Sequence, residues 1–199
     1  MNKNSADRHR QILEVATRRF SQNGYKKVTL KQIAADCGVT DAALYRHFSS
    51  KDAIYSEVLE SVRHRLADQQ VLDKIAENQT VEGILKGLAE HILEFFGENG
   101  DIYRLMLYSA LEGHEHAKKV FEMVRGRYIQ YLVEQLDLLY EKGDVVAKNN
   151  EITARCFIGM VFDCALGYSL WKGMQGRIYE ASQVIANNIP IYVYGLKNR

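Results

Sequence analysis

The chain has 199 residues, of which 47% are hydrophobic and 26% are charged, a balance typical of one or two folded globular domains. The most apolar run, Cys156–Trp171, contains Asp163, so we expect no membrane span. The first ten residues lack the apolar segment of a signal peptide, and three cysteines do not make a disulfide framework. These features predict a soluble, cytoplasmic protein with no membrane partner.

Basic residues are concentrated near the N-terminus, although the net charge of the chain is only +1. Residues 1–51 hold ten Lys and Arg against four Asp and Glu, a net charge of +6. Residues 52–199 hold sixteen against twenty-one, a net charge of −5. A clustered basic charge is the footprint of a nucleic-acid-binding domain, and the acidic remainder would keep the second part of the chain off the duplex.

The segment Ser5–Asn23 has the periodicity of an amphipathic helix. Its apolar residues share one face and are Ile12, Val15, Ala16 and Phe20, whereas arginines surround the polar side at positions 8, 10, 18 and 19. We expect most of these arginines to be solvated and one or two to contact phosphate. Gly24 is expected to end the helix.

Two short helices joined by a tight turn are predicted next. Thr29 and Gln32 have the Thr-x-x-Gln spacing of a capping box, which starts a helix. Gly38 is expected to end it, because glycine tolerates the left-handed conformation of a helix end. Thr40 then caps a second helix, DAALYRHF, over residues 41–48. A helix pair with a Gly-containing turn is the helix-turn-helix pattern.

The second of these helices has two distinct faces. At about 100° per residue, Leu44 and Phe48 fall on the inward side, and the opposite, exposed side holds Ala42, Ala43 and Arg46. Small alanines let the backbone approach a partner, an alanine methyl can touch a thymine methyl, and an arginine can donate two hydrogen bonds to guanine. Side chains that can reach phosphate oxygens flank this face at Thr29, Thr40, Tyr45, His47 and Lys51. Spacing alone leaves an ordinary surface helix pair as an alternative.

The residues 38–55, GVTDAALYRHFSSKDAIY, resemble the TetR family of transcriptional regulators. The shared pattern is Gly-Val-Ser/Thr, a small residue, Leu-Tyr, His-Phe and Ser-Lys-Glu/Asp. Upstream matches extend the resemblance over about residues 8–60 and are Phe20, Gly24-Tyr25, Thr29 and Ile33-Ala34. The resemblance implies an N-terminal three-helix helix-turn-helix DNA-binding domain, residues 1–51, and a C-terminal helical effector-binding and dimerisation domain, residues 52–199.

Asp41 departs from the pattern of a purely basic reading surface, because it places a carboxylate in the first turn of the second helix. It either stabilises the helix N-terminus or accepts a hydrogen bond from cytosine N4 as a further base reader. In both cases it weakens non-specific attraction to phosphate, so we expect greater dependence on a specific site.

The remainder of the chain also reads as helical, since it has a single proline, Pro190, and no strand-like alternation. A rigid helix is expected from Lys51, capped by Ser50, to about Gln70. Thr80 and Asn150 are expected caps. Further helices are predicted over residues 71–76, 81–97, 102–112, 115–141 with a bend near Gly126, 151–173 and 177–196. The fold class is therefore all-α.

The last two predicted helices are the most apolar, and a helix that is apolar all round is buried. A chain of this length cannot cover both, so we expect a homodimer in which they pair with their copies. The predicted interface residues are Phe157, Gly159, Asp163, Gly167, Ile185, Ile189 and Tyr192. Two symmetric reading helices would then enter successive major grooves about 34 Å apart, so the double-stranded operator should be palindromic.

The resemblance also implies a ligand pocket in the second domain, and such pockets are mostly apolar. The aromatic and methionine side chains expected to line it are Phe95, Tyr103, Met106, Phe121, Tyr128, Phe162 and Trp171, with tyrosine hydroxyls or Asp163 supplying orientation. Ordinary core packing is the alternative for each. We predict a ligand-responsive regulator, most often a repressor in this family, that a small hydrophobic or aromatic effector releases from DNA.

Other classes of function are less well supported. No Glu-x-x-His pair of a carboxylate-bridged metal protein occurs, and His114 and His116 are expected to lie in a solvated loop, so we expect no enzyme, cofactor or metal.

Cys156 and Cys164 would lie about 12 Å apart on one helix, too far for a disulfide within it. A redox switch through an inter-subunit bond or Cys37, and a regulator without a ligand, stay open.

Overall fold

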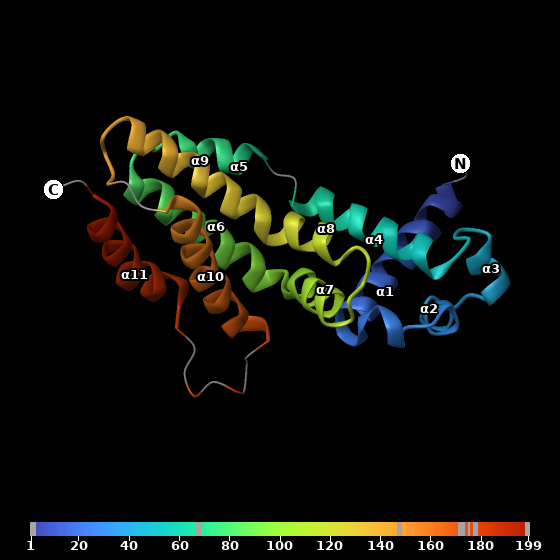
Figure 1. Cartoon of the computed structure of the whole chain (residues 1–199). Helices are drawn as coiled ribbons and strands as arrows, with labels where there is room; N and C mark the ends of the chain where they lie inside the picture. The colour runs from blue at the N-terminus through green and yellow to red at the C-terminus, as the bar shows by residue number, and fades with distance from the viewer. Residues whose placement is uncertain are drawn as a thin grey trace. The chain divides into compact units, whose positions relative to one another are not determined.

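A computed structural model describes residues 3–66, 69–146, 149–170, 174, 176 and 179–197, and these residues form helices without a β-strand (Figure 1). The all-α prediction is therefore confirmed. The helices are α1 (Lys3–Lys27), α2 (Leu30–Asp36), α3 (Asp41–Tyr45), α4 (Lys51–Leu66), α5 (Gln69–Ala76), α6 (Val81–Glu98), α7 (Gly100–Leu111), α8 (Ala117–Phe121), the π-helix η1 (Glu122–Gly126), α9 (Arg127–Glu141), α10 (Asn150–Ser169) and α11 (Ala181–Leu196). No helix in the described ranges is both long and apolar enough to cross a membrane.

The helices belong to two compact units, each described here by itself. The first unit comprises residues 1–67 and 101–123 and contains α1–α4, most of α7, and α8. The second comprises residues 68–100 and 124–199 and contains α5, α6 and α9–α11. The expected functional boundary after residue 51 differs from this division, which groups α4 with the reading helices, and that boundary stays a prediction.

The core of the first unit forms where the apolar faces of its helices meet. The side chains on these faces are almost fully buried and include Ile12, Phe20, Ile33, Leu44, Phe48, Ile54, Tyr55 and Val58. Burying each such side chain stabilises the fold by about 1.5–3 kcal/mol. The faces predicted from helical spacing are therefore confirmed for α1 and α3, and α4 buries one face in the same core.

Gly24 interrupts α1, as the sequence predicts, with a left-handed φ of 77°. A second constraint acts at the same position, because a Cβ atom here would lie 2.3 Å from Oε1 of Glu112. The Glu112 carboxylate accepts hydrogen bonds from the backbone N–H of Tyr25 (2.8 Å) and Lys26 (3.1 Å). Glycine is thus required both for the turn and for the approach of the residue that follows α7.

The second unit packs α10 against α6 and α9, and α11 against α6 (Figure 1). Its largest fully buried side chains are Phe96, Tyr128, Phe157 and Phe162. Helix α11 continues through Pro190, which lacks the N–H that would bond the carbonyl four residues earlier. Ala186, which holds that carbonyl, is exposed, so water can take the place of the missing donor and the helix does not end at the proline.

Several predicted helix boundaries are wrong. The helix expected from Lys51 to about Gln70 ends at Leu66, and Gln70 belongs to α5. The single helix expected over residues 115–141 is divided into α8, η1 and α9, and the bend expected near Gly126 is the wider π-helical turn that ends there. The cap of α10 is Asn149 rather than Asn150. Asn149 accepts from the N–H of Ile152 at 3.0 Å, whereas the Asn150 amide donates to Asp137 at 2.7 Å.

Glu112→Ala should lower the free energy of unfolding by about 1.5–3 kcal/mol, because it removes a charged acceptor from two backbone amides. Glu115→Ala is the matched control, since that carboxylate is exposed and lies 3.8 Å from His116. Its effect should stay within about 0.5 kcal/mol. Urea denaturation monitored by circular dichroism measures both, and equal small losses would contradict the structural role of Glu112.

Candidate nucleic-acid interface

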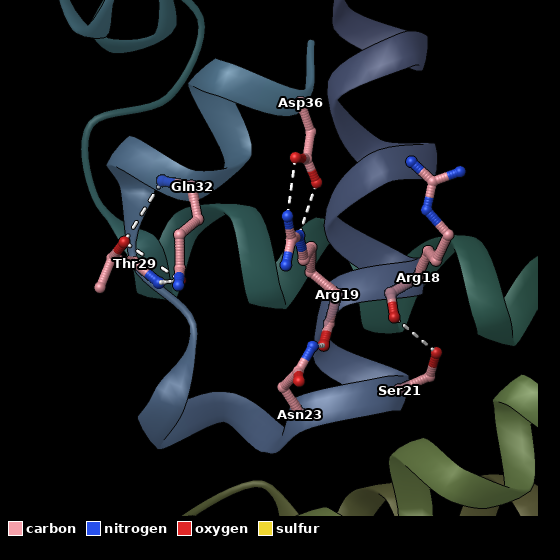
Figure 2. Close-up of polar contacts among 7 residues, drawn as sticks. All are labelled: Arg18, Arg19, Ser21, Asn23, Thr29, Gln32 and Asp36. Atoms are coloured by element: carbon pink, nitrogen blue, oxygen red, sulfur yellow. Dashed lines mark hydrogen bonds and ion pairs between the residues drawn. The ribbon is translucent and has the colours of Figure 1, made fainter.

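Helix α2 begins with the predicted capping box (Figure 2). The Thr29 hydroxyl oxygen accepts from the N–H of Gln32 at 3.2 Å, and Gln32 Oε1 accepts from the N–H of Thr29 at 2.9 Å. The Thr29 hydroxyl also donates to Gln32 Oε1 at 3.2 Å. Two amides that a helix start leaves without partners are satisfied in this way, and α2 starts at a defined residue.

Helix α2 is also fixed to α1 by a paired charge (Figure 2). Arg19 donates to both oxygens of Asp36, at 2.5 and 2.7 Å. This hydrogen-bonded guanidinium lowers the pKa of Asp36 below its usual value. The basic charge of Arg19 is therefore directed at the protein, and Arg19 is not one of the arginines available to phosphate.

The turn between the two helices uses Gly38 in the predicted left-handed conformation, with φ of 65°. The N–H of Gly38 donates to the carbonyl of Ala35 at 3.1 Å, and the N–H of Val39 donates to the carbonyl of Ala34 at 3.0 Å. This pair of bonds is the Schellman arrangement that ends a helix. It sets the direction in which the chain enters α3.

Helix α3 is shorter than predicted. Thr40 caps it as expected, accepting from the N–H of Ala43 at 3.2 Å, but the helix ends at Tyr45 instead of Phe48. The carbonyl of Leu44 accepts from both His47 (2.9 Å) and Phe48 (3.0 Å), so the chain is wound more tightly after Tyr45. This final turn still lets Leu44 and Phe48, at 0% and 2% exposure, anchor the helix pair in the core.

The face opposite these anchors is open. Asp41, Ala42 and Arg46 are exposed, and Ala43 is half-buried. A hollow of about 550 Å³ adjoins this face between the start of α1 and α3, lined by Ser5, Arg8, Ile12, Val39, Ala43, Arg46 and His47. Ser5 and Arg8 were not singled out as site residues from the sequence, because helical spacing does not show which part of α1 approaches α3.

Three of the predicted phosphate-contacting side chains remain accessible on this side of the helix pair. Tyr45 is 55% exposed, Thr40 is exposed and His47 is half-buried. His9 lies beside His47 and stacks on Phe48 with ring centroids 4.5 Å apart. Its Nε2 is 2.6 Å from the Glu57 carboxylate, so α1, the end of α3 and α4 are joined by one side chain.

Lys51 has a different role from the predicted phosphate contact. Its ammonium donates to the carbonyls of Tyr25 (2.9 Å) and Val28 (3.0 Å) and lies 4.1 Å from the centroid of the Tyr25 ring. Two of its three N–H donors are thus used inside the protein. Lys51, the first residue of α4, thereby fixes the segment between α1 and α2 to α4. Ser50 caps α4 as predicted, accepting from the N–H of Ala53.

The residues predicted to line an effector pocket divide between the units. Tyr103, Met106 and Phe121 belong to the first unit, where the first two are buried and Phe121 is 37% exposed. Phe95, Tyr128 and Phe162 belong to the second, and Trp171 lies outside the described residues. Asp163 is exposed on α10, which contradicts its predicted role of orienting a ligand in an apolar pocket.

The predicted dimer interface needs a similar correction. Phe157, Gly167 and Ile189 are already buried within one chain, and a side chain without exposure adds no area to an interface. Gly159, Asp163, Ile185 and Tyr192 keep part or all of their exposure. Ile152 and Tyr194, at 59% and 74% exposure, were missed, whereas Ile191, at 63%, lies on the apolar helix that was expected to need a second copy.

The site is a helix-turn-helix whose second helix presents small and basic side chains outward, which defines a DNA-binding protein. The family described as "Bacterial regulatory proteins, tetR family" matches residues 12–58. Nucleoid occlusion factor SlmA of Actinobacillus pleuropneumoniae is 30% identical over 194 residues, 97% of this chain and 80% of that one. SlmA of Haemophilus ducreyi is 29% identical over 133 residues, 65% of each chain.

Solved structures have the same fold. The fatty acid degradation regulator FadR of Bacillus halodurans superimposes with a TM-score of 0.67 and 22% identity over 96% of this chain and 97% of that one. The chain belongs to the TetR family of bacterial regulatory proteins, and is a DNA-binding transcriptional regulator rather than an enzyme.

Lys51→Met should lower the free energy of unfolding by about 1.5–3 kcal/mol, because it removes two charge-assisted hydrogen bonds while keeping the aliphatic stem. The dependence of DNA affinity on salt concentration should keep its slope. Lys31→Met, which changes an exposed lysine on α2, is the control for stability. A slope reduced by about one counterion per subunit, with unchanged stability, would restore the phosphate role of Lys51.

Proposed function

We propose that this protein is a repressor that binds a palindromic operator as a homodimer and leaves it when a small hydrophobic or aromatic effector binds. The observation that carries the proposal is the outward face of α3, formed by Ala42, Ala43 and Arg46. That face is held open because Leu44 and Phe48 are buried on the other side. A surface of two small side chains and one guanidinium suits the major groove better than solvent.

Different side chains on this surface would contact the bases and the phosphates. Arg46 can donate two hydrogen bonds to a guanine, and the alanine methyls can touch thymine. Asp41 remains a candidate to accept from a cytosine amino group. Thr29, Thr40, Tyr45 and His47 flank the face and would fix its position on the backbone, and Arg8 joins them because it lines the hollow beside Arg46.

Dimerisation is supported by apolar surface on α10 and α11. Ile152, Ile191 and Tyr194 are more than half exposed, and Cys156 is exposed one helical turn after Ile152. The two helices contact each other, since the Phe157 and Tyr192 ring centroids are 5.0 Å apart, and exposed apolar patches mark interaction surfaces. A two-fold pair would present two α3 helices to half-sites about one helical turn apart on the duplex.

Effector control needs a mechanical connection to the reading helices, and α7 offers one within the first unit. Tyr103 and Met106 are buried on α7, and Glu112, directly after this helix, holds the amides of Tyr25 and Lys26. A shift of α7 would therefore move the end of α1. An effector changes the DNA-binding equilibrium only by binding the two states with different affinities.

A second function is favoured by the match to SlmA, which covers 97% of this chain and whose name describes nucleoid occlusion. If this chain acted on the nucleoid as a whole, it would bind sites throughout the chromosome. Chromosome-wide mapping of bound DNA separates these two functions, since a repressor should occupy one or a few promoters.

A redox switch has little support. Burial raises the pKa of the Cys37 and Cys164 thiols, which makes both less reactive, and only the third cysteine, Cys156, is exposed.

Arg46→Ala should weaken binding to the selected operator by about 1–3 kcal/mol and relax the preference at one base position in each half-site. The operator is obtained by mapping the DNA protected upstream of the protein's own gene, and affinity is measured by fluorescence anisotropy. Arg10→Ala is the control, since Arg10 is exposed beside Asp7 and its loss should not change base preference. An unchanged preference after Arg46→Ala removes this base reader. Failure of the wild type to bind duplex DNA at low salt removes the proposed function.

Ile191→Glu should convert the dimer to monomers, because it places a charge in the apolar face of α11. Operator affinity should then fall at least about ten-fold, since two linked readers bind more tightly than one. Leu138→Glu changes a side chain on α9 that is 50% exposed and should leave the dimer intact. Sedimentation velocity gives the mass of each variant. A dimer that survives Ile191→Glu and dissociates with Leu138→Glu would place the interface on α9.

A further inference from the structure

We propose that Arg125 in the second unit is the anchor of a carboxylate-binding site, so that the effector is an organic acid with an apolar body. The inference rests on the proposed function, because it names the chemical class of the effector. Arg125 lies in η1, which connects α8 to α9 along the chain. It is not among the residues that sequence reasoning assigned to the pocket.

The guanidinium of Arg125 has a buried donor without an acceptor. Its Nε is inaccessible to solvent and has no hydrogen-bond partner among the described residues. No carboxylate in the described ranges forms an ion pair with this side chain. A buried unpaired donor on a charged group is costly, so such a group in a native fold calls for a partner that arrives from outside the chain.

Two contacts with α10 locate the guanidinium. Its central carbon lies 5.3 Å from the centroid of Phe162, and a Cβ atom on Gly159 would lie 3.4 Å from Nη2. Because residue 159 is glycine, no side chain at that position of α10 contacts Nη2. The Nε–H and an Nη–H of an arginine point in parallel and match the two oxygens of a carboxylate.

Phe162, over whose ring the guanidinium lies, belongs to a group of buried aromatic rings. Phe162, Phe96 and Tyr128 are at most 1% exposed, and the Phe96 and Phe162 ring centroids are 4.7 Å apart. The Tyr128 hydroxyl lies 3.1 Å from Nε2 of His91, and burial raises the pKa of Tyr128 to about 12. We call Phe96, Tyr128 and Phe162 the ring cluster. It can pack against an aliphatic or aromatic body, while the neutral Tyr128 phenol adds no competing anion.

The local backbone also favours a binding site here. A π-helical turn is rare and less stable than an α-helical one, and it occurs preferentially at functional sites. Residues Glu122–Gly126 adopt it immediately before α9. A ligand that pairs with Arg125 would act on this turn and on the chain that continues into α8. Effector control further requires that the ligand bind two states of the protein with different affinities.

The charge of the site favours a monoanion. Arg125 offers one guanidinium edge, and a single carboxylate balances its charge without leaving a net charge beside the ring cluster. A neutral amide of the same skeleton would fill the same apolar space but would not neutralise the guanidinium. Comparing an acid with its own amide therefore isolates the interaction with Arg125.

The test measures binding of 3-phenylpropanoate and octanoate against 3-phenylpropanamide and octanamide by titration calorimetry on the purified full-length protein. Each acid should bind at least about ten-fold more tightly than its amide, as expected for a bidentate charge-assisted pair. Arg125→Met should bring acid and amide within about two-fold of each other. Arg104→Met, which removes an exposed arginine on α7, should keep the full preference.

Thermal unfolding of the ligand-free proteins provides a second measurement. If Arg125 served only to stabilise the fold, Arg125→Met would lower the melting temperature, whereas a ligand-binding arginine whose buried Nε has no internal acceptor predicts an unchanged or higher one. Acids that bind no better than amides to the wild type, or a preference that survives Arg125→Met, overturn the inference. Operator binding of the ligand-free wild type is measured alongside. If it is intact while acid preference is absent, the inference fails and the DNA-binding function stands.

Discussion

The contacts that hold the segment Gly24–Val28 are the constraint on which the geometry of the first unit depends. Two charged side chains bind the backbone of this segment. Glu112 accepts hydrogen bonds from the N–H groups of Tyr25 and Lys26, and Lys51 donates to the carbonyls of Tyr25 and Val28. The Tyr25 ring meets Tyr55 and His114 edge-on, at 5.0 and 4.4 Å, and its hydroxyl donates to Asp52. The reading helices therefore begin from a fixed point rather than from a loose linker, and α4 and the end of α7 both act on that point.

The parts of this arrangement that the sequence predicts are those encoded within a few residues. The capping box of Thr29, the left-handed Gly24 and Gly38, and the cap at Thr40 are each set by neighbours less than one or two turns away. The periodicity of α3 likewise identifies Leu44 as an anchor. For these reasons the helix-turn-helix and its outward face could be derived from the sequence almost completely.

The contacts that the sequence did not reveal join residues far apart in the chain. Glu112 and Tyr25 are separated by 87 positions, and no periodicity relates them. Lys51 follows a predicted serine cap and matches the family motif, so a phosphate contact was a reasonable prediction, but the carbonyls it binds are set by how α1 ends. Phe157 and Ile189 were assigned to a dimer interface because apolar spacing marks a buried face without saying whether the same chain or a second copy buries it.

Two departures from local rules occur together in η1, and they have a common physical sense. A folded protein normally satisfies its buried donors and avoids π-helical turns, because each costs stability that a marginally stable fold can ill lose. The unpaired Nε of Arg125 and the π-helix that carries it occur together, whereas the buried amides and carbonyls around Tyr25 are matched by charged partners. A regulator needs this asymmetry. Under the proposed function, the reading helices must keep one geometry to fit a groove, and the effector must bind one state of the protein more strongly than the other. An unpaired donor such as Nε of Arg125 is one group that a ligand could satisfy in one of those states.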